Sequence, residues 1–289
     1  MSDIVVRNKN SKNITSLSLD KNELRRLLDI LQERTSSACE FENKKIDSDE
    51  TEVYDKLLAK ENLKKCSVLQ VTITGLEDKV LLGTIDEVFN SVSFPERIKS
   101  VYVHSEIPYK SLLNYYPENF FEFFIDFSKP KVFDFSLQPS ERTPNFSQIK
   151  VEGSDNTWVN GVFHEIDSEI KNKNSKFTTI HKGSIYDLLI WFIGLPFGFW
   201  VCYKFSSFIT NAFIASPFLK SAFYVYLFFL SLFIIRILFH YFRWVFPMIE
   251  YRNKKENSIG HKILLGSLGL SILGSFIYDI LRIFFNFKT

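Results

Sequence analysis

Four polar side chains recur at every fourth position near the C-terminal end of the chain, and they could line a path for ions. They are Ser267, Ser271, Ser275 and Asp279. Because an α-helix has about 3.6 residues per turn, this spacing places them on one gently drifting stripe. The surrounding segment, 260–286, is otherwise mostly apolar, and about 20 such residues suffice to cross a bilayer. Since an acid inside a membrane usually faces a cavity or a protein interior, the stripe predicts a pore built from several copies of this helix.

Three glycines beside the stripe favour a second interpretation, in which this face only packs against other helices. They are Gly266, Gly269 and Gly274. Small residues let transmembrane helices approach closely, and serine hydroxyls can bond across the contact. Arg282 lies three residues after Asp279, on the same face, where it could neutralise the acid. Both interpretations stay open from the sequence.

Two further apolar runs precede this segment. The sequence therefore predicts a transmembrane domain over 185–289, with spans at approximately 187–204, 221–246 and 260–286. Pro196 interrupts the first span and is a candidate gate hinge, because proline breaks the helical hydrogen-bond ladder. Basic residues concentrate before the first span and between the second and third, which predicts that these segments and the N-terminal half are cytoplasmic. The segment 205–220 could be an interfacial helix, a re-entrant segment or part of a fourth span.

Residues 1–184 have the composition of an ordinary cytoplasmic domain. A capping box at Asp20 and Glu23 predicts a helix to about residue 34, followed by a polar loop over 40–52. Further helices are expected over 51–63, after Thr84, and over 157–171. Alternating apolar residues predict strands at 4–7, 14–19, 68–74, 79–82, 98–104, 120–127, 132–137 and 148–152. These elements predict an α+β sensor domain with a mainly antiparallel sheet and helices largely on one face.

No familiar catalytic or metal-binding motif occurs in the chain. The patterns GxxxxGK[ST], GxGxxG, HExxH and GxSxG are absent, and the three cysteines lack the spacing of a metal site. We therefore expect no enzyme activity, catalytic residue, metal or cofactor. Aromatic residues near Lys99 and Lys110 could stack bases and hold phosphates, although an ordinary mixed surface explains them as well. These aromatic residues are Tyr102, Tyr109, Tyr115 and Tyr116.

The layout resembles the membrane effectors of bacterial antiphage defence, and among these the Hailong-type effector. The resemblance rests on an N-terminal α+β domain joined to a few C-terminal spans and on the Gly/Ser stripe Gly266–Ser275. No family motif matches residue by residue, so no family site residue is carried over. The resemblance implies an oligomeric channel-like protein, such as a tetramer, in the lipid of the bacterial inner membrane. It also implies control by a nucleotide or oligonucleotide that a partner nucleotidyltransferase makes.

The leading hypothesis from the sequence is a homo-oligomeric effector that disrupts the membrane through a pore gated by the cytoplasmic domain. The alternative is a membrane-anchored scaffold that recruits a cytosolic partner and conducts no ions. A membrane-tethered enzyme has the least support, because no catalytic constellation was found.

Overall fold

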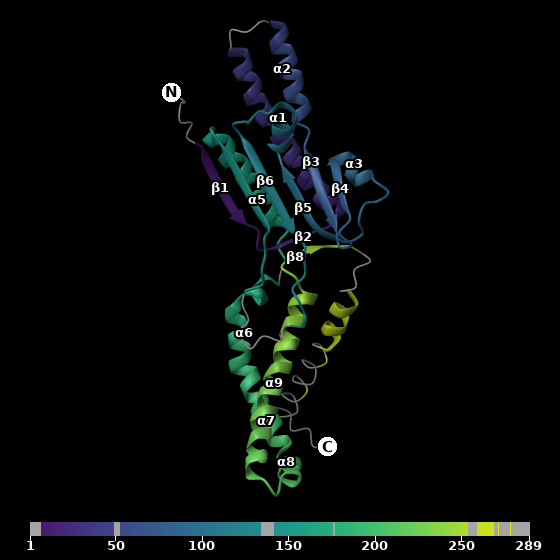
Figure 1. Cartoon of the computed structure of the whole chain (residues 1–289), viewed down its shortest axis with the longest axis vertical. Coiled ribbons are helices and arrows are strands. Elements are labelled where there is room, and N and C mark those ends of the chain that lie inside the picture. The colour runs from purple at the N-terminus through teal and green to yellow at the C-terminus, as the bar shows by residue number, and fades with distance from the viewer. Residues whose placement is uncertain are drawn as a thin grey trace. The chain divides into compact units, whose positions relative to one another are not determined.

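The chain divides into two units in the computed structural model, which describes residues 7–48, 53–133, 142–175, 177–253 and 259–268, together with 271 and 278 (Figure 1). The first unit contains 1–130, 138–188 and 247–253. The second contains 131–137, 189–246 and 254–289. The sequence placed one boundary at 184/185, whereas the structure returns 247–253 to the first unit.

A six-stranded sheet forms the centre of the first unit, in the order β1-β7-β6-β5-β3-β4. Every neighbouring pair is antiparallel, which confirms the predicted antiparallel sheet. Alternate residues point to one face, so that β6 buries Phe121, Phe123 and Ile125. The strands are β1 Asn8–Asn13, β3 Gln70–Gly75, β4 Val80–Thr84, β5 Ile98–His104, β6 Phe120–Asp126 and β7 Gln148–Gly153.

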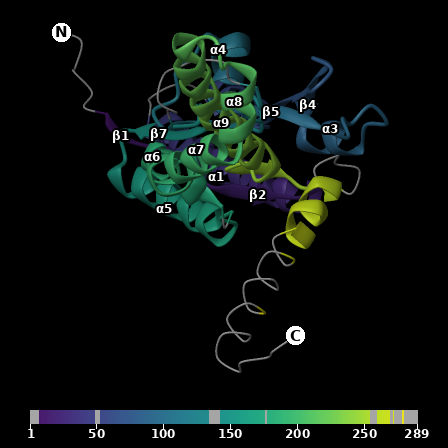
Figure 2. The ribbon, with the colours of Figure 1, turned by 90° about the horizontal axis from the view of Figure 1, so that it is seen from below.

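Two long helices, α1 (Lys21–Ser48) and α5 (Asn156–Asn172), lie on one side of this sheet (Figure 2). Their apolar faces join the buried sheet residues in one core, to which α1 contributes Leu24, Leu28 and Leu31. Asp155 caps α5 by accepting hydrogen bonds from the N–H groups at 157 and 158. Shorter helices of this unit are α2 (Val53–Cys66), α3 (Ile85–Asn90), α4 (Ile107–Leu113) and a 3₁₀ turn, η1 (Thr178–His181), and the unit also holds most of α6 (Gly183–Leu189).

The helix α1 continues to Ser48 and replaces most of the predicted loop at 40–52. The cause is a buried carboxylate in this polar stretch. Glu42 is 1% exposed, and it accepts hydrogen bonds from the Tyr115 hydroxyl (2.5 Å) and the Glu118 N–H (2.7 Å). These partners satisfy the charge, so the acidic run stays helical instead of turning into solvent.

The expected strand at 4–7 lies outside the described residues except for residue 7, which is not in a strand. The strand β1 was not predicted, and the expected strand at 14–19 shortens to β2 (Leu17–Leu19). The expected strand at 132–137 is not seen at 132 and 133, and its other residues lie outside the described ones. The strand β2 pairs in parallel with β8 (Ile249–Tyr251), forming a separate two-stranded sheet.

The second unit contains the apolar helices. A continuous helical run over Gly183–Lys204 comprises α6 (Gly183–Leu189), the π-helical turn Ile190–Gly194 and α7 (Leu195–Lys204); its first residues belong to the other unit. After α8 (Ser206–Ala212) follows α9 (Pro217–Val245). Among the described residues, Gly183–Lys204 and Pro217–Val245 are the two helices long and apolar enough to span a membrane. The third predicted span is described only at 259–268, 271 and 278, all helical, so three spans are not established.

The segment 205–220 resolves into α8 and a turn before α9. Seven helical residues extend only about 10 Å, so α8 cannot cross a bilayer on its own. Its placement at an interface or in a re-entrant segment stays a prediction.

Candidate functional site

The helices α7 and α9 form an antiparallel hairpin with close contacts at two glycines. An added Cβ at Gly198 would lie 2.9 Å from the Phe228 ring. At Gly194 it would lie 3.3 Å from Leu232. These glycines have GxxxG spacing, which allows helix backbones to approach closely. This spacing is visible in the sequence, but small-residue packing was predicted only for 260–286, and the pair Gly194 and Gly198 was not predicted.

Most of the apolar surface of the hairpin is exposed. Only 17% of the most apolar window of each long helix is buried. Large side chains such as Phe192 (75% exposed) and Phe218 (78% exposed) face outward. A core helix of a water-soluble protein would be mostly buried, so this surface requires lipid or further apolar helices around it. The two helices are therefore weak but consistent evidence of membrane association.

Pro196 lies directly after the π-helical turn Ile190–Gly194, within the first turn of α7. Proline has no N–H to donate to the carbonyl four residues earlier, and a π-helical turn is a common way to accommodate such a break. The run thus stays helical but departs from regular α-helical geometry just before Pro196. Its role as a gate hinge stays a prediction.

The described part of the polar stripe is satisfied within its own helix. The Ser267 hydroxyl donates to the carbonyl of Leu264 (2.8 Å), and the Ser271 hydroxyl donates to the carbonyl of Ser267 (2.9 Å). Apart from the neighbouring residues and the backbone of its own helix, no atom of the described residues lies within 4 Å of an added Cβ at Gly266. The remaining stripe and glycine candidates, Ser275, Asp279, Gly269 and Gly274, lie outside the described residues. Pore lining and packing between copies are both compatible with this geometry.

Aromatic residues connect the end of α9 with the start of the helix at 259. The Tyr241 hydroxyl lies 2.7 Å from Nδ1 of His261. The rings of Trp244 and His261 meet edge to face at 5.3 Å. Amphipathic aromatic side chains are typical of the level where a membrane meets water. This cluster is a candidate for the membrane boundary at that end of the hairpin.

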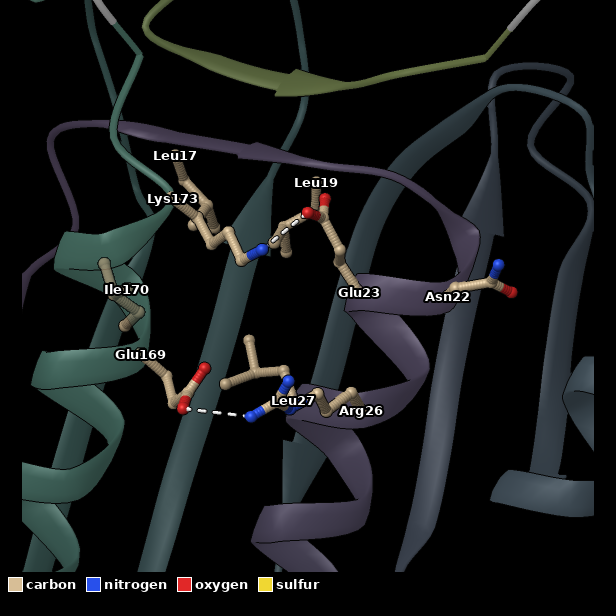
Figure 3. A pocket seen from close by; sticks show the side chains of 9 residues that line it. All are labelled: Leu17, Leu19, Asn22, Glu23, Arg26, Leu27, Glu169, Ile170 and Lys173. Carbon is tan, nitrogen blue, oxygen red and sulfur yellow. Dashed lines mark hydrogen bonds and ion pairs between the residues drawn. The ribbon is translucent and has the colours of Figure 1, made fainter.

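A charged cluster in the first unit connects the segment that precedes the α7–α9 hairpin with the segment that follows it. Glu23, in the first turn of α1, accepts a hydrogen bond from Lys173 Nζ (2.6 Å), just after α5, as Figure 3 shows. It also accepts one from Arg252, just after β8. Burial alone would raise the pKa of Glu23, but hydrogen bonds from Lys173, from the Asp20 N–H and from Arg252 lower it to about 2. The carboxylate is therefore charged at all physiological pH values.

Backbone hydrogen bonds at β2 reinforce the same connection. The Ser18 N–H donates to the Lys173 carbonyl (2.8 Å). On its other side, the Arg252 N–H donates to the Leu19 carbonyl (2.6 Å). We call β2, β8, Glu23, Lys173 and Arg252 the junction. Sequence analysis recognised Glu23 only as a capping residue, because its long-range partners leave no local pattern.

A cavity of about 160 Å³ lies beside the junction, between α1, α5 and β2 (Figure 3). Its walls include Leu17, Leu27 and Ile170. At the opening, Arg26 and Glu169 form an ion pair at 3.7 Å. Opposite charges thus offset one another at the rim, and the cavity shows no preference for an anion or a cation.

A row of aromatic rings crosses the face of the sheet opposite α1 and α5. The residues are Tyr102 and His104 on β5, with Phe120 and Phe124 on β6. His104 stacks on Phe120 (5.9 Å between centroids), and Tyr102 meets His104 and Phe124 at 6.3 Å each. Burial lowers the pKa of His104, so this ring is largely neutral at pH 7. The row can stack on planar aromatic groups such as nucleobases.

The charges beside the aromatic row nearly balance. Arg7 lies over the Phe120 ring, 5.7 Å from its centroid. Lys150 pairs with Glu122 and Lys9 with Glu152. A ligand there would gain from stacking more than from phosphate attraction.

The four tyrosines singled out in the sequence do not form one site. Tyr102 belongs to the aromatic row, whereas Tyr109 is buried beside Cys39 and Cys66. Tyr115 bonds to Glu42, and Tyr116 is exposed beside Lys110. The other three members of the row were missed, because their proximity depends on the register between β5 and β6.

Within the described residues, no group of three or more His, Cys, Asp or Glu side chains could hold a metal ion. Comparisons of the chain with protein-family models, with curated proteins and with solved structures found no match. The observations define a class by architecture alone: an α+β unit connected to an apolar helical hairpin.

Proposed function

We propose that the protein is a homo-oligomeric membrane effector whose apolar segments form a channel-like pore gated by the N-terminal unit. The observation that carries the proposal is the hairpin of α7 and α9. Its large apolar surface is exposed, and both of its ends lead into the first unit, through α6 and through β8.

This connectivity supports a topology. A hairpin whose two ends lead into the same water-soluble unit crosses the membrane twice and returns to the side from which it started. The basic residues before the first span and after the second favour the cytoplasm for that side. If 260–286 crosses as well, the C-terminal end lies outside the bacterial inner membrane.

In the proposed pore, several copies of 260–286 surround a common axis. Ser267, Ser271, Ser275 and Asp279 of each copy would line or edge the path, and Pro196 would serve as the gate hinge. A pore from so few spans requires a symmetric oligomer, for which a tetramer is one solution.

The proposed signal is a nucleotide or oligonucleotide made by a partner nucleotidyltransferase, as the resemblance to antiphage effectors suggests. The aromatic row is the surface that we propose for its bases: its rings are half-buried, and stacking on the accessible parts of aromatic rings tolerates any base. The junction is the proposed route to the membrane, because it binds both segments that flank the hairpin. A change at the first unit would then control ion flow and, in antiphage defence, the integrity of the membrane.

The alternative is a membrane-anchored scaffold that conducts no ions. One observation favours it: the Ser267 and Ser271 hydroxyls bond to their own helix, so they need neither water nor a pore. The stripe would then serve only for packing.

Ion flux through proteoliposomes containing the full-length protein tests the proposal. Flux should change on adding a short oligodeoxynucleotide or a cyclic dinucleotide, and Asp279→Asn combined with Ser271→Leu should alter it. The matched control is Ser267→Ala, which keeps a small residue on the same face and should alter flux less. Silence under every condition, with the protein verified as inserted and oligomeric, would favour the scaffold.

A further inference from the structure

The strand β4 forms one edge of the six-stranded sheet, and part of its main chain has no partner. The Gly75 N–H donates to the Lys79 carbonyl (2.8 Å), so alternate residues of β4, counted from Lys79, bond to β3. Val80 and Leu82 lie between these residues, and their N–H and C=O groups point away from β3. Within the described part of the chain, no hydrogen bond joins these outward groups to another segment. They are therefore available to a further strand.

The two edges of the sheet differ in how they meet such a strand. At the opposite edge, β1 is entirely polar and carries Lys9 and Lys12, and lysines on an edge strand oppose pairing with a further strand. The strand β4 contains no charged residue and no proline. Its side chains on the open face are apolar and exposed, Val80 by 58% and Leu82 by 67%. Of the two edges, β4 is thus the one suited to accept a strand.

A groove of about 490 Å³ lies beside the start of β4, between the β3–β4 turn and the loop 92–97. Its apolar walls include Leu81, Phe94 and Pro95. The Leu76 N–H donates to the Arg97 carbonyl (3.1 Å), which holds the loop to the turn. Because the loop is already held in place, a ligand in the groove would pay little to order it.

The surroundings of β4 indicate which kind of strand fits. In both views, α3 and the loop that follows it flank β4 on its outer side (Figures 1 and 2). A twofold contact between two copies would repeat these elements on both sides of the seam and would bring the two α3 helices and loops together. A single extended segment meets no such obstacle. The charged residues at the groove offset one another, so they favour neither an acidic nor a basic segment; they are Glu77, Lys79, Glu96 and Arg97.

We infer that β4 accepts an extended, largely apolar segment of a partner protein as a further strand of the sheet. The main chain of this segment bonds to the outward groups of Val80 and Leu82. Since side chains alternate along a strand, one set packs beside Val80 and Leu82, and the other set enters the groove at Leu81 and Phe94. Main-chain bonds supply affinity in this mode of recognition, and the groove supplies specificity. The inference goes beyond the proposed function and applies to a pore and to a scaffold alike.

Selection of peptides on the full-length protein in lipid nanodiscs tests this inference. The probe is a phage-displayed library of random hexapeptides, and the variant is Leu82→Pro. Proline removes the outward N–H, whereas the bonds of Leu81 and Gly83 to β3 remain, so an edge strand tolerates it. Selected peptides should bind the wild type about tenfold more tightly than this variant. Leu82→Ala keeps the N–H and is the matched control, which should lose less affinity.

Methylation of the peptide main chain gives a second test that leaves the protein unchanged. In a bound strand, the N–H groups of alternate residues face β4 and the others face away. N-methylation of one alternate set should therefore weaken binding to the wild type about tenfold, and methylation of the other set should not.

Three results would overturn the inference: a selection that returns no peptide, equal binding to the wild type and Leu82→Pro, or equal effects of the two methylated sets. A wild-type dimer that Leu82→Pro abolishes would overturn the choice of a partner protein over a second copy. None of these measurements depends on ion flux.

Discussion

Replacing Glu23 with glutamine should loosen the junction while preserving the shape of the side chain. The carboxylate receives charged hydrogen bonds from Lys173 and Arg252. Glutamine retains one acceptor oxygen for the donors Lys173, Arg252 and the Asp20 N–H, so it can keep a hydrogen bond to one cation but without the opposite charge. The second cation then loses its partner, and both lose the charge interaction. We expect β2 and β8 to separate more often, while the six-stranded sheet stays intact.

The lowered pKa of Glu23 sets the magnitude. Its decrease from 4.5 to about 2 corresponds to about 3 kcal/mol of preference for the charged form in the folded unit, at about 1.4 kcal/mol per pKa unit. The Glu23 side chain is 22% exposed, so solvent screens the interaction only in part. Because glutamine keeps one hydrogen bond, we expect a loss of about 2 kcal/mol. That loss corresponds to about 30-fold more frequent opening.

The pH dependence has a defined sign. A carboxyl whose pKa is lowered by folding stabilises the folded state above its unfolded pKa, near 4.5, and loses this contribution as the pH falls toward 2. The difference between wild type and Glu23→Gln should therefore be constant from pH 5 to pH 8. Below pH 4.5 it should shrink, and near pH 2 it should vanish.

Hydrogen exchange of the full-length protein, reconstituted in lipid nanodiscs, measures the local opening directly. This is preferable to global unfolding, because a chain with two units need not unfold in one step. Peptides covering β2 and β8 should exchange about 30-fold faster in the variant, and peptides covering β5 should not change. The matched control is Glu61→Gln on α2, whose ion pair with Lys65 is exposed and therefore contributes little to stability. Equal effects of the two substitutions at β2 and β8 would refute the reasoning.

Two further predictions concern the hairpin and the aromatic row. Gly198→Leu should lower the melting temperature of the detergent-solubilised protein, because the larger side chain overpacks the α7–α9 contact at a cost of about 1–3 kcal/mol. Gly266→Leu is the control and should not lower it, because the space around Gly266 is open. Equal decreases in the two variants would contradict the close contact. Tyr102→Ala with Phe124→Ala should weaken binding of a fluorescent hexadeoxynucleotide by about 1–3 kcal/mol per base that loses its stacking partner, with only a weak dependence on salt. Tyr116→Ala, an exposed tyrosine outside the row, should leave binding unchanged, and comparable losses in both proteins would exclude the row as the binding surface.

Local patterns in the sequence predicted much of the first unit. The strand β5 has the bounds that its alternation indicated, and the capping boxes at Asp20 and Thr84 start α1 and α3 as predicted. These signals succeed because an alternation or a cap depends on residues within a few positions of one another. The extended α1 was missed because its polar second half is stabilised by Glu42, which besides the nearby Lys45 binds Tyr115 and Glu118, more than 70 residues away.

The candidate functional residues were harder to predict for the same reason. Residues 247–253 belong to the first unit because β8 pairs in parallel with β2 over three residues. Three residues are too few to show the alternation of apolar and polar residues that predicts a strand. The aromatic row depends on the register of β5 against β6. The Gly194–Gly198 spacing, in contrast, was readable, and only its contact with α9 required the structure.

The late position of β8 in the chain has a consequence for biogenesis. A ribosome makes β2 at the beginning of synthesis, but the strand that pairs with it follows both apolar helices, and Arg252 lies 229 residues after Glu23. The first unit therefore cannot complete its fold before the hairpin has been synthesised. If the hairpin enters a membrane as proposed, β8 can pair with β2 only after both apolar helices have been synthesised. Insertion of the hairpin then becomes a condition for finishing the domain that precedes it, and a chain whose hairpin fails to insert would keep an unfinished junction.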